Sequence, residues 1–218
     1  GCGDDVGKLA QACKDDDSTA CKKLRDIRKE ACENKKDAQS CYDLGDMYYK
    51  GVPGVKKDDN EAWAVYRDAC DGKHGLGCRM LAIMHGSGQG VKRDTEKSAE
   101  IYKKAVEYFE KGCEKGNNSD CGEAGLEYSL GKNVEQDLHK SLQYFEKFCD
   151  NLDSKPSKDD LEKCYNIGYM YYHGLGTRQD KIGIKLKNIL ALFVIKAHKI
   201  PAMVLKESKN EEKQEQQK

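Results

Sequence analysis

One phrase of eleven residues occurs twice in this sequence, and both copies carry a glycine inside a helical pattern. Residues 41–51 read CYDLGDMYYKG, and residues 164–174 read CYNIGYMYYHG. Nine of the eleven positions hold identical or similar residues. Because an interior glycine costs a helix about 0.5–1 kcal/mol relative to alanine, its return at the same place indicates a repeated structural unit.

Four copies of this unit follow one another when the chain is aligned on the cysteine that opens the phrase. They begin at Cys41, Cys78, Cys121 and Cys164. Each copy reads as helix, turn and helix, with the apolar residues of a helix spaced to lie on one face. An aspartate after the turn is well placed to cap the second helix, and the four units supply Asp58, Asp94, Asp137 and Asp180.

The units differ in length and share a small residue in the first helix. The second unit has about seven extra residues between Asp94 and Cys113, nearly two helical turns, so we expect a longer helix whose inner face stays in phase. The shared small residue should let the backbone of a neighbouring helix approach closely; it is Gly45, Ala82, Gly125 or Gly168.

A single helical hairpin cannot bury its own apolar stripe, so such units have to stack. The sequence therefore predicts an all-α fold, a superhelix (solenoid) of helical hairpins stapled by disulfides. The stretch from Cys21 to Cys32 is too short for a hairpin and should form one helix. The expected organisation is an N-terminal segment at 1–12, a repeat array at 13–200 with units of about 41–77, 78–120, 121–163 and 164–200 after a shortened first unit, and a charged disordered tail at 201–218.

The last unit departs from the pattern after Asp180. Where the second helix should end in a cysteine, a basic and aliphatic stretch without cysteine follows. This stretch is interpreted either as a divergent capping helix or as a frameshifted C-terminus.

Ten of the eleven cysteines fall into neighbouring pairs located at the unit junctions. The pairs are 13/21, 32/41, 70/78, 113/121 and 149/164, and Cys2 is left over. Zinc ligands are usually more closely spaced, so the regular pairs favour disulfides in an oxidising compartment over a metal site. His74 lies between two cysteines and could imitate a metal ligand, but we favour a turn histidine. Each small disulfide loop should contribute roughly 2–3 kcal/mol.

The start of the chain, Gly-Cys-Gly, fits a mature sequence after removal of a signal peptide. Cys2 then suits the lipid acceptor of a bacterial lipoprotein, which would attach the protein to a membrane. The alternative is a free thiol after a cloning residue. The longest uncharged apolar run, residues 189–195, is far too short to span a bilayer.

The net charge constrains the class of partner. The chain carries 38 basic and 38 acidic residues, for a formal net charge of zero. This balance argues against nucleic acid as the main partner, and equally against attachment to anionic membranes by charge alone.

Residues 44–70 and 167–180 follow the pattern LGxxYxxGxGVxxDxxKAxxYxxKAC and resemble the Sel1-like repeat, a relative of the tetratricopeptide repeat. With cysteine pairs at the unit junctions, residues 20–180 are similar to the Helicobacter cysteine-rich proteins. The resemblance implies a secreted or periplasmic α/α superhelix with disulfides between Cys70 and Cys78 and their counterparts. It also implies an interaction scaffold, although some members are penicillin-binding proteins or weak β-lactamases. Related eukaryotic proteins occupy the mitochondrial intermembrane space, which is the alternative location.

Catalytic signatures are weak in this sequence. Ser129 to Lys132 matches Ser-x-x-Lys, but neither Ser-Asp-Asn nor Lys-Thr-Gly follows. We therefore predict no catalytic residue, no cofactor and no metal. The favoured function is a scaffold that binds a protein or peptide on its concave face, and the alternative is a β-lactamase-like or penicillin-binding protein acting on β-lactam or peptidoglycan-like ligands.

Overall fold

The computed structural model describes residues 2–152, 157, 159–160 and 163–164 of the 218-residue chain. The predictions for the fourth unit beyond Cys164, including Gly168 and Asp180, and for the tail lie outside these residues. The described part is all-helical apart from one isolated bridge between Val52 and Val55, which confirms the predicted fold class. Its helices are α1 (Cys2–Lys14), α2 (Ser18–Lys35), α3 (Ala38–Lys50), α4 (Asp59–Asp71), α5 (Gly75–Ser87), α6 (Thr95–Glu114), α7 (Asn118–Leu130) and α8 (Leu138–Asp150).

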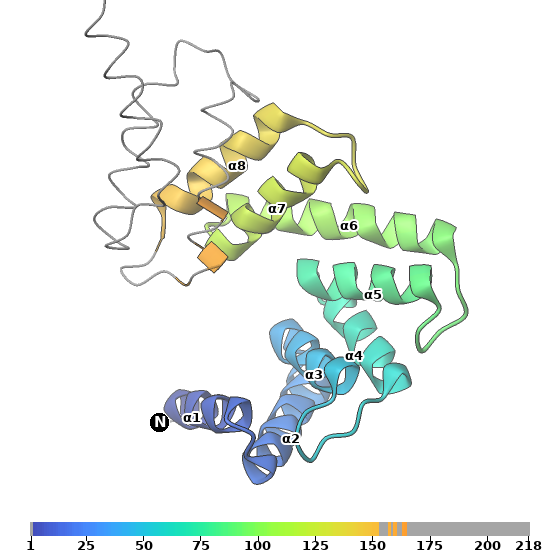
Figure 1. The fold of residues 1–218 in the computed structure, drawn as a ribbon, viewed down its shortest axis with the longest axis vertical. Helices are drawn as coiled ribbons and strands as arrows, with labels where there is room; N and C mark the ends of the chain where they lie inside the picture. Colours follow the sequence, from blue (N-terminus) through green and yellow to red (C-terminus); the bar gives the residue numbers. More distant parts are fainter. Residues whose placement is uncertain (1, 153–156, 158, 161–162, 165–218) are drawn as a thin grey trace, which may run out of the picture. The chain divides into compact units, whose positions relative to one another are not determined.

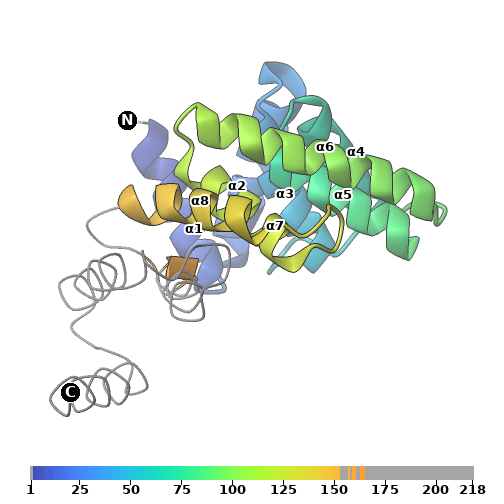
Figure 2. The same cartoon turned by 90° about the horizontal axis from the view of Figure 1, so that it is seen from above.

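The chain divides into two compact units, residues 1–111 and residues 112–218. In the first unit each helix from α1 to α4 packs on the next one (Figure 1), and α3 also contacts α5 while α2 contacts α4. Alternate helices are thus neighbours, as in stacked hairpins. In the second unit α7 packs along α8 (Figures 1 and 2).

The helix lengths and caps agree with the repeat pattern. Helix α6 has 20 residues, seven more than the 13 of α4 and α8, so the extra residues of the second repeat lengthen its helix. The predicted aspartate caps are also present. Asp58 accepts from the backbone N–H groups of Asn60 and Glu61, Asp94 from Lys97 (2.8 Å) and Asp137 from Lys140 (2.9 Å).

Two helices, α1 and α2, precede α3 in the chain. Helix α2 is the single helix expected between Cys21 and Cys32. Residues 1–12, which the repeat pattern placed outside the array, lie largely in α1, and α1 packs on α2. The buried cluster at this end contains Cys13, Cys21, Leu24, Met47 and Val55, with Val6, Leu9 and Ala10 packed against it.

The glycines in the first helices are explained by an aromatic ring rather than by a helix backbone, which corrects the expectation. A Cβ on Gly45 would lie 2.5–2.9 Å from ring carbons of Tyr66, and one on Gly125 2.8–3.0 Å from those of Phe145. Both rings come from the second helix of the same hairpin and are fully buried. The glycine is needed because the ring lies directly on the backbone of the first helix.

Candidate functional site

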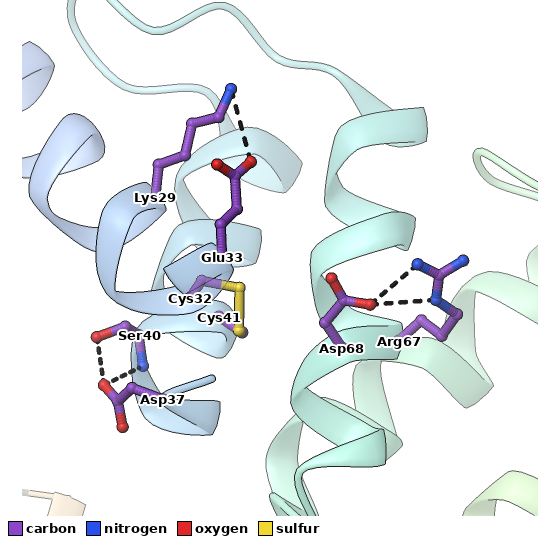
Figure 3. Close-up of a disulfide and its surroundings, with 8 residues drawn as sticks. All are labelled: Lys29, Cys32, Glu33, Asp37, Ser40, Cys41, Arg67 and Asp68. Carbon is purple, nitrogen blue, oxygen red and sulfur yellow. Dashed lines mark hydrogen bonds and ion pairs between the residues drawn. A yellow bond between two sulfur atoms is a disulfide. The ribbon is translucent and has the colours of Figure 1, made fainter. Parts of the chain in front are cut away.

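Five disulfides join consecutive elements of the described chain. They are Cys13–Cys21, Cys32–Cys41, Cys70–Cys78, Cys113–Cys121 and Cys149–Cys164. All ten bridged cysteines are at most 9% exposed. Figure 3 shows one example, in which Cys32 near the end of α2 meets Cys41 near the start of α3, close to the Lys29–Glu33 ion pair and the Asp37–Ser40 cap. These bridges indicate an oxidising compartment.

A capping residue stands four positions before the second cysteine of each short pair. Asp17, Asp37, His74 and Asn117 accept a backbone N–H at the starts of α2, α3, α5 and α7. These caps were not predicted, although each stands at a fixed spacing before a cysteine. Each cap satisfies a backbone donor that the first helical turn leaves unpaired.

His74 has a structural role at the start of α5. Its Nδ1 accepts the N–H of Gly77 at 3.1 Å, so Nε2 carries the proton and donates to Oε1 of Gln39 at 3.0 Å. The ring stacks on Tyr42 with centroids 4.9 Å apart. Burial lowers the pKa of His74, because it disfavours the charged imidazolium. This geometry fits the turn histidine that we favoured.

The other candidate side chains also serve the fold. The Ser129 hydroxyl donates to the Leu126 carbonyl (2.8 Å), and the Ser129 carbonyl accepts from the Gln136 side chain (2.8 Å), so Ser129 helps to end α7. Within the described residues, no group of three or more His, Cys, Asp or Glu side chains is arranged to hold a metal ion.

Among the described helices, none combines the length and the apolar character needed to cross a membrane.

The most promising surface lies on α3 and α5, which contact each other in the first unit. On α3, Tyr42, Asp46 and Tyr49 follow one another at helical spacing and are half-buried. On α5, Leu76, Met80 and Ile83 do the same. We call these six residues the α3–α5 face. It offers aromatic and aliphatic side chains that the packing of the unit leaves partly open to solvent.

Asp46 belongs to a cluster with three tyrosines, of which Tyr42 and Tyr49 lie on this face and Tyr66 is buried beneath it. The buried Tyr66 of α4 donates its hydroxyl to Oδ1 of Asp46 at 2.7 Å. The centroid of the Tyr66 ring lies 6.0 Å from the ring centroid of Tyr42 and 6.3 Å from that of Tyr49. Burial, together with the Asp46 carboxylate, raises the pKa of Tyr66 far above its ordinary value, so it remains a donor. We call Tyr42, Asp46, Tyr49 and Tyr66 the tyrosine–aspartate cluster.

The second unit buries acidic groups on α7 instead. Glu123 and Glu127 are only 8% and 5% exposed, and Glu123 pairs with Lys163 at 3.1 Å. Burial, and secondarily Glu123, raises the pKa of Asp120 to about 6. The burial of Glu123 and Glu127 was not predicted, because glutamate normally lies on a solvated helix face. The burial of Glu127 was indicated by the repeat, because this residue occupies the same repeat position as the buried Met47.

The Sel1 repeat family matches residues 38–74, 75–117, 121–151 and 164–182, more than half of the chain. The chain belongs to the Sel1 repeat family. This match confirms the resemblance to the Sel1-like repeat drawn from the sequence. Sel1 repeat proteins are scaffolds that typically bind other proteins.

Curated relatives match a limited part of the chain. Cytochrome c oxidase assembly factor 7 of Xenopus tropicalis is 36% identical over 90 residues, which are 41% of this chain and 38% of that protein. Chitin synthase regulatory factor 3 of Schizosaccharomyces pombe is 38% identical over 64 residues, 29% of this chain and 7% of that protein. The matches therefore span less than two fifths of these relatives.

One solved structure shows the same fold. A Sel1 repeat protein from Oxalobacter formigenes is similar with a TM-score of 0.52 and 21% identity, over 84% of this chain and 67% of that chain. Cysteine rich protein B of Helicobacter pylori is also similar, with 29% identity over 55% of this chain and 92% of that chain and a TM-score of 0.35.

Proposed function

We propose that this chain is a non-catalytic scaffold that binds a protein or peptide in an oxidising compartment through its α3–α5 face. The observation that carries the proposal is the half-buried state of Tyr42, Tyr49, Met80 and Ile83 on two helices in contact. Tyrosine and methionine are enriched in protein interfaces, where a rigid or adaptable apolar side chain fills a partner's pocket. The proposal gives a location to the concave binding face expected from the sequence.

The disulfides support a role as a rigid platform. They fix the end of one helix to the start of the next, so the helices that present the face are held in register without a deep core. A platform of this kind loses little conformational freedom when it binds. The face and its supports are built from helices rather than from mobile loops.

Two compartments remain for this scaffold. Relatives named as cytochrome c oxidase assembly factors support the mitochondrial intermembrane space and a role in assembling a larger protein complex. The bacterial periplasm or secretion is the other location, and there the lipid on Cys2 would attach the chain to a membrane. Mass spectrometry of the protein from its native host separates them, because a diacylglycerol on Cys2 is expected only in the second case.

Site-specific photo-crosslinking in the native cell tests the binding face. A photoreactive phenylalanine analogue replaces Tyr42 or Ile83, and the control carries it at Glu61, an exposed position on α4. We expect one discrete protein adduct from the two face positions and none from Glu61. Equal adducts at all three positions, or an adduct at Glu61 alone, would contradict the proposal.

A further inference from the structure

We infer that the tyrosine–aspartate cluster is the docking point for one cationic side chain, lysine or arginine, of the partner. This inference rests on the proposed function and adds the chemistry that the partner must bring to the α3–α5 face. It follows from one carboxylate beside two partly exposed aromatic rings and one buried ring, and from the cations that this arrangement already attracts.

The carboxylate of Asp46 is held in place before any partner binds. Tyr66 fixes Oδ1 through its hydroxyl (2.7 Å). Tyr42 precedes Asp46 by four residues and Tyr49 follows it by three, so both lie beside the carboxylate on the same face of α3. A carboxylate supplies a charge-assisted hydrogen bond to a cation, and an aromatic ring attracts a cation within about 6 Å of its centroid.

Two of the chain's own lysines already lie at the cluster. Nζ of Lys50 contacts Oδ2 of Asp46 at 2.5 Å, and Nζ of Lys57 lies 5.7 Å from the ring centroid of Tyr49. The side chains of these lysines are 64% and 51% exposed. Lys50 is mostly exposed although Asp46 is 25% exposed. Because an ion pair one turn apart on a helix is weak, a partner's cation can replace Lys50 at Asp46 with little loss.

The cluster belongs to one hairpin among those described. At the positions of Asp46 and Tyr66, the α7–α8 hairpin has Leu126 and Phe145. The carboxylate and the hydroxyl that orients it are therefore absent together. Helix α5 has Ile83 at the position of Asp46. Of the hairpins compared at these two repeat positions, α3–α4 is the one with a carboxylate and a tyrosine hydroxyl, which would fix where a basic residue of the partner binds.

The experiment is an NMR titration of the oxidised full chain with N-acetyl-arginine methylamide. The matched probe is the citrulline compound, which has nearly the same shape but no charge. We expect amide resonances from Tyr42 to Lys50 to shift with arginine, and binding of citrulline to be about three- to fivefold weaker. Equal responses to the two probes would overturn the inference.

Variants separate cation binding from a structural role. Asp46→Asn keeps an acceptor for Tyr66 but removes the charge, so arginine affinity should fall by about three- to fivefold. Lys50→Ala removes the internal competitor and should raise the affinity. Tyr49→Leu removes the aromatic ring and should bind arginine more weakly. An unchanged affinity in Asp46→Asn, or a loss in Lys50→Ala, would refute the site.

The titration tests the cation site and the crosslinking tests the scaffold function, so that either proposal can be refuted without the other. If arginine shows no preference over citrulline while Tyr42 still gives a discrete adduct, the cation site is refuted and the scaffold function stands. If arginine binds as expected but neither Tyr42 nor Ile83 gives an adduct, the site is supported as a cation-binding point and the scaffold function is refuted.

Discussion

The α3–α4 and α7–α8 hairpins are built on the same plan but bury different chemistry. Both place a glycine of the first helix against a buried ring of the second, and both cap the second helix with an aspartate. At one shared position α3 buries Met47, whereas α7 buries Glu127. The repeat therefore specifies backbone geometry closely, while its interior positions remain free to carry polar groups.

The surface of the two hairpins differs in a correlated way. Where α3 has Asp46, the partner ring is Tyr66 and its hydroxyl donates to the carboxylate. Where α7 has Leu126, the corresponding ring is Phe145, which has no hydroxyl. The polar pair Asp46 and Tyr66 is thus replaced by the apolar pair Leu126 and Phe145. Neither hairpin leaves a buried hydroxyl of this ring position without an acceptor. The following predictions test how far the hairpins are equivalent.

The largest effect is expected when the acidic interior of α7 is transferred to α3. Met47 is 4% exposed and packs in a cluster with Cys13, Cys21, Leu24 and Val55. Met47→Glu places a carboxyl group among apolar neighbours, so we expect a loss of about 3 kcal/mol or more in the free energy of unfolding. Trp63, the single tryptophan, reports on this unit by fluorescence in urea. Met47→Leu is the control and should cost less than about 1.5 kcal/mol; equal losses would show that charge is not the cause.

Removal of one disulfide should affect the two units equally. Cys70–Cys78 and Cys113–Cys121 both have a sequence separation of 8. Loop entropy predicts a loss of roughly 2–3 kcal/mol for either double alanine variant. Trp63 fluorescence follows the first unit, and a Trp63→Phe, Tyr144→Trp background follows the second. A clearly unequal loss would mean that local packing, rather than chain entropy, determines what each bridge contributes.

The repeat, the disulfide pairs and the aspartate caps were predictable because each depends on a residue type at a fixed spacing. Helix α1 was not, since no cysteine-opened phrase marks it. The cap by His74 and the burial of Glu127 left a signal in the repeat positions that was not used. The contact of Tyr66 with Asp46 was not predictable, because it depends on how α3 and α4 meet and a periodic pattern in one helix does not contain that information. The repeated glycine position was predicted, but the aromatic ring that packs against it was not, because that ring belongs to another helix.

Adding a methyl group at the glycine slot should have a smaller effect that differs between the hairpins. Alanine improves helix propensity by about 0.5–1 kcal/mol. At Gly45, however, its Cβ would lie 2.5 Å from the Tyr66 ring, and at Gly125 2.8 Å from the Phe145 ring. We expect net losses of about 1–3 kcal/mol, larger for Gly45→Ala, in urea unfolding. Gly7→Ala is the control, because nothing lies within 4 Å of its Cβ. If Gly45→Ala is as stable as Gly7→Ala, the ring contact is not a constraint.

The smallest effect is a response to acid that has opposite signs in the two units. Burial lowers the pKa of His74, although Asp43 and Asp37 oppose the shift. The unfolded chain then binds the proton more readily, so the first unit loses stability as the pH falls below about 6.5. The pKa of Asp120 is raised to about 6. Its folded form holds the proton more tightly than the unfolded chain does, so the second unit gains stability as the pH falls from 7 towards 4.

Urea unfolding at pH 7 and pH 5, followed with the two tryptophan reporters, measures both responses. Each should be on the order of 1 kcal/mol or less after solvent screening. His74→Asn keeps a capping oxygen like that of Asn117 and should abolish the loss in the first unit. Asp120→Asn should abolish the gain in the second. Because neither substitution removes a helix or a disulfide, a response that survives it must come from another titrating group. A shift of the same sign in both wild-type units would show that the buried groups of α7 do not distinguish the two hairpins.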